Sequence, residues 1–129
     1  MMLNARSVYN KKENLKKLLK ETGSEINLIS ETWERKRINL ETLLAPTQFK
    51  SISYARSKRP GGGCAIFYND GRFKVSKLEV SIPDGVEAVY GLFVPIKPDP
   101  SLRVKKIVVG SFYVSPNSQH KAATIEHII

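Results

Sequence analysis

Residues 25–36, EINLISETWERK, combine the pattern of a core strand with a carboxylate directly at its end. Their apolar residues predict a short buried strand over 26–30, because a brief apolar run between polar turns is typical of a core strand. The strand runs directly into Glu31, which Trp33 and a burst of charge follow. Acids are common at exposed ends of elements, but the rim of a sheet is also where open α/β architectures bind ligands. Both interpretations of Glu31 stay open at this point.

In the rest of the chain, segments with apolar residues at helical spacing alternate with segments that have the pattern of strands. A helix over 10–21 is expected to stop at Thr22 and Gly23, and Asn69, Asp70 and Gly71 predict a tight hairpin turn. Further helices are expected over 36–44 and 118–129, and further strands end at Asn4 or cover 49–55, 64–69, 72–80, 86–96 and 103–114. Strands outnumber helices, so the chain is predicted to be an α+β protein of mixed α/β layers rather than a doubly wound parallel sheet.

Composition limits the function classes. The chain has 129 residues, a length that is enough for one domain. Its formal net charge of +9 favours a polyanionic partner such as nucleic acid. The longest apolar runs, CAIF and IVVG, are far shorter than a membrane span. The first residues lack the apolar segment of a secretion signal, and Cys64 has no disulfide partner. A nuclear or cytoplasmic location is expected, without secretion and without membrane insertion.

Two other features have ordinary explanations. RPGGG, residues 59–63, lacks the Lys-Ser/Thr pair and the following helix of a phosphate-binding P-loop. Its glycines are expected to allow a tight entry into the next strand. Cys64 lies inside that strand and is expected to be a small buried core residue.

Three expected strands end on polar side chains: Asn4 in LNARS, Glu31 in INLISETW and Tyr113 in SFYVSPN. An amide, a carboxylate and a phenol are thus presented at strand ends. Polar groups of this kind can form a binding site when they lie together at one rim of a sheet.

These motifs also carry a resemblance. LNARS, INLISETW, RPGGGCAIFYND and VVGSFYVSPNSQH resemble, in order and spacing, the endonuclease/exonuclease/phosphatase superfamily, and most of all the apurinic-like endonuclease domain of non-LTR retrotransposon polyproteins. The resemblance implies a four-layer α/β-sandwich, of which residues 1–129 would be the N-terminal part of a single domain. It implies cleavage of DNA phosphodiesters with Mg²⁺ or Mn²⁺, and a reverse transcriptase in the same polyprotein.

Residue by residue, the resemblance implies that Glu31 is the metal-binding acid and that Asn4 supports the metal and phosphate end of the site. Tyr113 matches the catalytic tyrosine whose hydroxyl faces the scissile phosphate. Oxygen ligands suit a hard cation, and a phenol can donate a hydrogen bond to developing charge.

Five further residues are expected at phosphate or DNA. Arg6 falls in the first motif, where a bidentate phosphate contact and a structural salt bridge are about equally expected. Asn117 follows the tyrosine motif and would shape the rim. Arg56, Lys58 and Arg59 form a basic loop that can hold backbone phosphates without reading sequence.

The sequence also departs from the superfamily pattern. It reaches Ile129 before the "GDFN"-like and "SDH"-like motifs, and His120 and His127 do not match the catalytic histidine. The chain is therefore expected to be catalytically incomplete alone, as a genomic fragment or an incomplete gene model. Two alternatives remain: a basic nucleic-acid-binding remnant without catalysis, and a phosphatase of the superfamily acting on a lipid or inositol phosphate.

Overall fold

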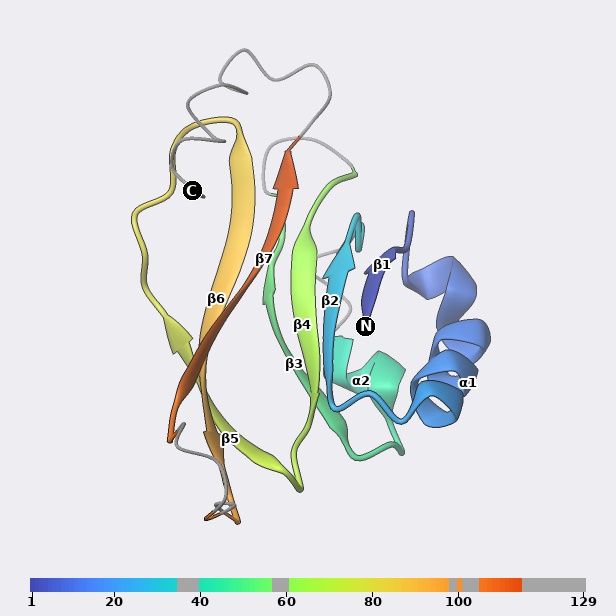
Figure 1. The fold of residues 1–129 in the computed structure, drawn as a ribbon. Helices are drawn as coiled ribbons and strands as arrows, with labels where there is room; N and C mark the ends of the chain where they lie inside the picture. The colour runs from blue at the N-terminus through green and yellow to red at the C-terminus, as the bar shows by residue number, and fades with distance from the viewer. Residues whose placement is uncertain (35–39, 57–60, 98–99, 101–104, 115–129) are drawn as a thin grey trace.

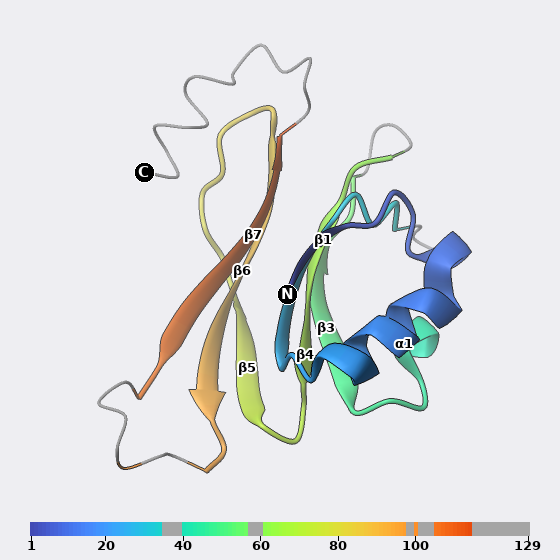
Figure 2. The same cartoon turned by 45° about the vertical axis from the view of Figure 1, so that its right-hand side comes forward.

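A computed structural model describes residues 1–34, 40–56, 61–97, 100 and 105–114. Two β-sheets face each other, and helices pack on the outer side of one of them (Figures 1 and 2). The elements in chain order are β1 Met2–Asn4, a 3-10 turn Tyr9–Lys11, α1 Lys12–Thr22, β2 Ile26–Ser30, α2 Leu40–Leu44, β3 Phe49–Tyr54, β4 Cys64–Asn69, β5 Phe73–Leu78, β6 Val86–Pro95 and β7 Ile107–Val114.

Sheet A has the strand order β1-β2-β4-β3. Strands β1 and β2 are parallel and place Asn4 opposite Ser30. Strand β4 pairs antiparallel with both β2 and β3. Because β4 lies in the middle of the sheet and is covered on both faces, five of its six residues are buried, and CAIFYN shows no polar alternation.

Sheet B has the order β5-β6-β7, with antiparallel pairing throughout. The register of β6 and β7 sets Glu87 directly opposite Tyr113 and Val89 opposite Ser111. Directly opposite residues point to the same face of a sheet. Phe93, Val89 and Val109 on that face pack against sheet A, so Glu87 and Tyr113 also face the space between the sheets.

The core has two layers, one on each face of sheet A. The helices and the outer face of sheet A enclose the first, whose largest buried side chains include Leu19, Leu44 and Phe67. The second lies between the sheets, where the Phe93 ring meets Tyr68 edge-on at 5.7 Å between ring centroids. Gly91 faces this layer because an added Cβ would lie 2.6 Å from the Ile52 side chain of sheet A.

Most predicted elements are confirmed with shifted ends. The first helix spans Lys12–Thr22 and ends at Gly23, whose φ of 63° is the left-handed conformation of a helix stop. Strand β7 begins at Ile107, later than predicted, because Lys105 and Lys106 are solvated and contribute no apolar side chain. The expected helix over 118–129 lies outside the described residues.

One prediction is wrong. Asn69, Asp70 and Gly71 do not join two paired strands, because β4 belongs to sheet A and β5 to sheet B. The turn is tight, with the Arg72 amide donating to the Asn69 carbonyl at 3.0 Å. It nevertheless carries the chain from one sheet to the other. Turn chemistry fixes the local reversal, but burial of the apolar faces decides which strands pair.

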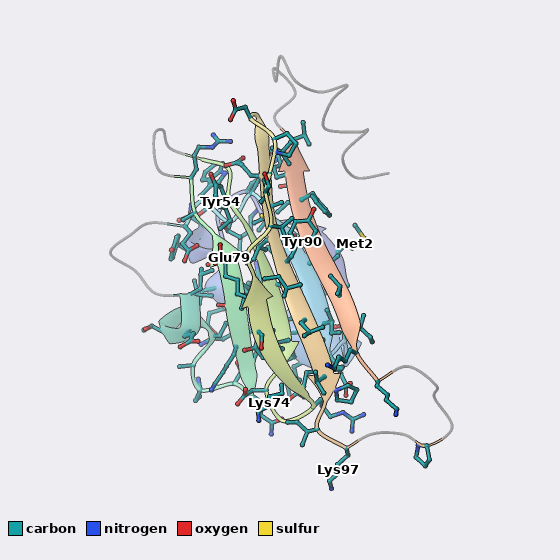
Figure 3. The ribbon with its side chains drawn as sticks, turned by 90° about the vertical axis from the view of Figure 1, so that its left-hand side faces the viewer. Met2, Tyr54, Lys74, Glu79, Tyr90 and Lys97 are labelled. Atoms are coloured by element: carbon teal, nitrogen blue, oxygen red, sulfur yellow. The ribbon has the colours of Figure 1, made fainter. Side chains whose placement is uncertain are left out.

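The architecture is therefore α+β, as predicted, and the described residues form three layers: helices, sheet A and sheet B. Figure 3 looks onto the outer face of sheet B, where Tyr90 and Lys74 are labelled. Within the described ranges, no helix combines the length and apolar character needed to cross a bilayer. The predicted single domain over 1–129 and the nuclear or cytoplasmic location stay predictions.

Candidate functional site

One end of the sandwich collects most of the polar side chains that face inward. Strands β1, β2, β3 and β7 end there, and β4 and β6 begin there (Figure 1). We call it the site end, and the other the opposite end. Asn4, Glu31 and Tyr113, predicted from three separate motifs, all lie at the site end. The parallel pairing of β1 with β2 and the register of β7 bring them to this end.

Glu31 begins a turn that is held on both sides. Its carbonyl accepts from the Ser7 amide at 2.9 Å, and the Trp33 amide donates to the Gly62 carbonyl at 2.9 Å. Beyond the strand ends, the segment after β2 therefore stays hydrogen-bonded to the segment after β1 on one side and to the segment before β4 on the other. This scaffold fixes the Cα of Glu31 relative to its neighbours, so the backbone sets the direction of its Cα–Cβ bond.

Backbone strain gathers at the same place. The non-glycine residues with positive φ in the described chain are Arg6, Ser7, Glu31 and Trp33, with φ between 46° and 83°. A positive φ costs an ordinary residue of order 1–2 kcal/mol. Such strain persists only where surrounding contacts over-determine the backbone, and it concentrates at functional sites. Its confinement to the ends of β1 and β2 supports a functional role for this end.

Tyr113 and Glu31 approach each other across the two sheets. Hydrogen bonding of the Tyr113 hydroxyl to the Glu31 carboxylate is the main reason why the pKa of Tyr113 is raised above its usual value of 10.0, and burial raises it further. The Arg56 charge lowers the pKa in part, and the Glu87 charge raises it. The phenol is consequently a neutral hydrogen-bond donor throughout the physiological pH range.

A second acid, Glu87, lies beside this pair and was not found from the sequence. It accepts from Arg56 at 2.8 Å on each carboxylate oxygen and from the Gly63 amide at 3.3 Å. The available signal was an acid inside the apolar run VEAVYGLFV, because a buried charge needs a partner. Glu87 lies outside the four motifs that carry the resemblance.

Arg56 therefore lies in a bidentate ion pair within the protein, with its side chain 16% exposed. Its predicted contact with DNA phosphate stays a prediction. Arg6, by contrast, is exposed at the rim. Lys58, Arg59 and Asn117 lie outside the described residues.

Asn4 lines a cavity between the edge of sheet A and β7. The cavity measures about 300 Å³ and is lined by Met2, Leu3, Asn4, Leu28, Ser30, Gly110, Ser111 and Phe112. Ser111 Oγ donates across the sheets to the Ile29 carbonyl at 3.4 Å. Glu31 and Tyr113 are not in this lining, so Asn4 shares their end of the sandwich but faces the adjoining cavity.

The donor set fits a hard divalent cation. No group of three or more His, Cys, Asp or Glu side chains gathers within the described ranges, so a site enclosed by protein ligands is not formed there. The Glu31 carboxylate suits Mg²⁺ or Mn²⁺, which keep several waters and use few protein ligands, whereas the Asn4 amide lines the adjoining cavity. Zn²⁺ usually takes Cys and His ligands, and neither Glu31 nor Asn4 supplies one.

Comparisons with known proteins follow the fold. No protein-family model and no curated protein sequence matches the chain. Two crystal structures of ANGEL2, a 2',3'-cyclic phosphatase, are similar over 81% of this chain. The first has a TM-score of 0.58 and 21% identity, and the second, a complex with adenosine-2',3'-vanadate, has 0.54 and 18%. The matched region spans 31% and 32% of those chains. The chain thus has the α+β fold of part of ANGEL2, whose fold is of the endonuclease/exonuclease/phosphatase type.

Proposed function

We propose that the site end is the metal-binding and phosphate-binding part of a phosphodiesterase site, and that its substrate is DNA. The observation that carries the proposal is that the strand ends of both sheets meet here, with the strained Glu31 at the end of β2 and Tyr113 at the end of β7, close enough for Glu31 to raise the pKa of the phenol. This arrangement places a carboxylate that suits a hard cation beside a phenol that suits a phosphate oxygen. The two groups come from different sheets and distant motifs, and the strained Glu31 backbone supports the same reading.

Glu31 would hold Mg²⁺ or Mn²⁺, and Asn4 would support the metal and phosphate end of the site from the adjoining cavity. The bound cation would polarise the phosphate and stabilise the leaving oxygen. A cation held by Glu31 would compete with Tyr113 for the carboxylate oxygens. A bound phosphate would offer the Tyr113 hydroxyl a non-bridging oxygen as an alternative acceptor. Because the pKa of Tyr113 is raised, the hydroxyl keeps its proton for this contact.

A water-orienting group and a proton acceptor are still needed. The histidines of the chain, His120 and His127, lie outside the described residues, and Glu87 is occupied by Arg56 and Gly63. We expect these functions to come from further polypeptide, which the resemblance assigns to a retroelement polyprotein. General acid–base catalysis alone contributes about 10²–10⁴ in rate. We therefore expect no measurable cleavage by the 129-residue chain.

Charge and exposure support a nucleic-acid substrate. The net charge of +9 favours a polyanion. Arg6 and Trp33 are both exposed at the site end, and Trp33 retains 39% of its side-chain accessibility. A basic side chain can hold phosphate, and an exposed indole can stack on an unpaired base.

A second candidate substrate is a nucleotide 2',3'-cyclic phosphate. It rests on the fold similarity to ANGEL2, one structure of which holds adenosine-2',3'-vanadate. The same carboxylate and phenol can serve either phosphodiester, so the substrate has to be distinguished by assay. A nucleic-acid-binding remnant without catalysis is the remaining outcome.

The first test measures metal binding by the 129-residue chain. Terbium(III) is a hard cation whose luminescence is sensitised by nearby Tyr and Trp side chains, so Tyr113 and Trp33 report binding beside Glu31. Glu31→Gln removes the charge but keeps the shape, and is expected to abolish the saturable signal. Glu21→Gln is the matched control, because Glu21 is an exposed partner of Lys17 on α1. Equal binding by wild type and Glu31→Gln would overturn the proposal.

The second test measures cleavage after fusing the C-terminal part of an active relative after Ile129. We expect Mg²⁺-dependent nicking of supercoiled plasmid that Glu31→Gln and Tyr113→Phe each reduce. Hydrolysis of adenosine 2',3'-cyclic phosphate without nicking would favour the second candidate. Salt-sensitive DNA binding without any hydrolysis would favour the remnant.

A further inference from the structure

Among the side-chain links between the sheets at the site end, two involve a carboxylate. The first is the contact of Tyr113 with Glu31, which raises the pKa of the phenol. The second is the ion pair of Arg56, which follows β3 in sheet A, with Glu87 of β6 in sheet B. Gly63, at the entry to β4, reinforces the second link by donating its amide to Glu87. We call Arg56, Glu87 and Gly63 the brace.

The brace touches both members of the first link through the backbone. Glu87 is directly opposite Tyr113 in the pairing of β6 with β7. On the other sheet, the Gly63 carbonyl accepts from the Thr32 amide at 3.3 Å, one residue after Glu31. Within the brace, Glu87 is therefore the direct strand neighbour of Tyr113. Gly63 is bonded to Thr32, the residue that follows Glu31.

The two links differ in what a bound cation does to them. A cation held by Glu31 would compete with Tyr113 for the carboxylate oxygens, so the first link would change when the site is filled. Glu87 is satisfied by charge-assisted bonds on both oxygens, and its side chain is only 11% exposed. Buried bidentate arginine–carboxylate pairs are strong and geometrically specific. The second link therefore persists while the first one changes partners.

We propose that Arg56 and Glu87 are positioning residues: the brace holds the two sheets at the separation at which Glu31 can bind a cation while Tyr113 remains within reach of its phosphate. This inference rests on the proposed function of Glu31 and Tyr113. It assigns Arg56 a role inside the protein in place of the DNA contact expected from its basic loop.

The packing of Arg56 on Gly62 independently supports a fixed position of the guanidinium in the brace. A Cβ at Gly62 would lie 2.3 Å from Arg56 Nη2 and 2.4 Å from its Cζ, and φ at Gly62 is +62°. The guanidinium thus packs directly on the glycine backbone. The glycine run is needed for this close packing of the brace, besides the entry into β4.

The decisive experiment is terbium titration of the 129-residue chain carrying Arg56→Gln. Simple electrostatics predicts tighter binding, because a positive charge near a cation site is removed. The brace predicts the opposite sign: weaker binding by about 10- to 100-fold, the usual effect of losing a partner that orients a metal ligand. Arg72→Gln is the matched control, because it breaks an exposed arginine–glutamate pair at the opposite end and is expected to leave terbium binding unchanged.

Two further variants separate positioning from charge and from folding. Arg56→Lys keeps the charge but loses the bidentate fork, and Gly62→Ala displaces the guanidinium without changing any charge. Both are expected to weaken terbium binding. Gly23→Ala is the control for backbone strain, since Gly23 has φ of +63° and open space around an added Cβ. Far-UV circular dichroism at the titration temperature verifies that each variant is folded, and should Arg56→Gln be unfolded, these two variants decide.

The outcomes distinguish the two proposals. Glu31-dependent binding that weakens in the folded brace variants supports the inference. Glu31-dependent binding that is unchanged or tighter in those variants overturns the brace and leaves the proposed function standing. Terbium binding that ignores Glu31→Gln overturns the proposed function and the brace with it.

Discussion

The two ends of the sandwich each carry an arginine–glutamate pair, and the pairs differ in solvent exposure and in geometry. At the site end, Arg56 and Glu87 are 16% and 11% exposed and make a bidentate contact. At the opposite end, Arg72 and Glu25 are 63% and 37% exposed, with Arg72 Nε 2.8 Å from a Glu25 oxygen. The buried pair has given up its hydration and depends on its geometry, whereas water can replace either partner of the exposed pair.

The same contrast extends to the backbone and the core. Positive φ values at non-glycine residues occur at the ends of β1 and β2 within the described chain, while the turn over 69–71 at the opposite end contains none of them. The space between the sheets is apolar in the middle and changes to Ser111, Glu87 and Tyr113 toward the site end. Strain, buried charge and polar groups thus coincide at one end, as expected where selection favours function over stability.

The largest expected effect is the loss of the buried carboxylate. Glu87→Ala removes the carboxylate that holds the partly buried Arg56 charge in a bidentate pair, and should lower the free energy of unfolding by about 3–5 kcal/mol. Glu25→Ala at the opposite end should lower it by at most about 1 kcal/mol, because its pair is solvated. Urea unfolding followed by circular dichroism measures both. Similar losses at the two ends would remove the basis of the comparison.

Next in size is an added methyl group at a left-handed glycine. Gly63→Ala places a Cβ 2.6 Å from Thr32 Oγ1 at a φ of +82°, so strain and overpacking should together cost about 2–4 kcal/mol. Gly23→Ala meets no atom within 4 Å and should cost about 1–2 kcal/mol from φ alone. Thermal unfolding of the two variants compares them, and a costlier Gly23→Ala would contradict the tight packing at the site end.

Cys64 offers a chemical probe of the site end. Burial raises the pKa of its thiol to about 12, so the folded protein should be almost unreactive to Ellman's reagent at pH 8 and should react once urea unfolds it. The raised pKa also favours the folded state only while the thiol keeps its proton. Stability should therefore fall as pH rises above 9, with a shallower slope in Cys64→Ala. Rapid labelling of the folded chain would show that the site end opens.

The smallest expected effect concerns an apolar residue at the opposite end. Val108 is 61% exposed on the outer side of sheet B, near the start of β7, and Figure 3 views this outer face. Val108→Thr should change the free energy of unfolding by no more than about 0.5 kcal/mol. It should nevertheless reduce binding of an apolar fluorescent dye, since exposed apolar surface attracts such dyes. Undiminished dye binding would show that the apolar surface lies elsewhere.

Much of the fold was predictable from local pattern. The helix stop at Gly23, the buried run of β4 and the extended segments β6 and β7 follow from apolar spacing and from the φ preference of glycine, which depend on neighbours along the chain. The buried character of Cys64 follows in the same way. The assignment of β5 to sheet B was not predictable, because Asn69, Asp70 and Gly71 favour the same tight turn whether or not the flanking strands pair.

Local sequence pattern is enough to place an amide, a carboxylate and a phenol at strand ends, since Asn4, Glu31 and Tyr113 each close an apolar run. The contact of Tyr113 with Glu31 and the pairing of Glu87 with Arg56 arise from the packing of the two sheets. Both contacts cross from one sheet to the other and depend on strand register and sheet packing. Local preferences do not encode these, because they result from burying two apolar faces against each other.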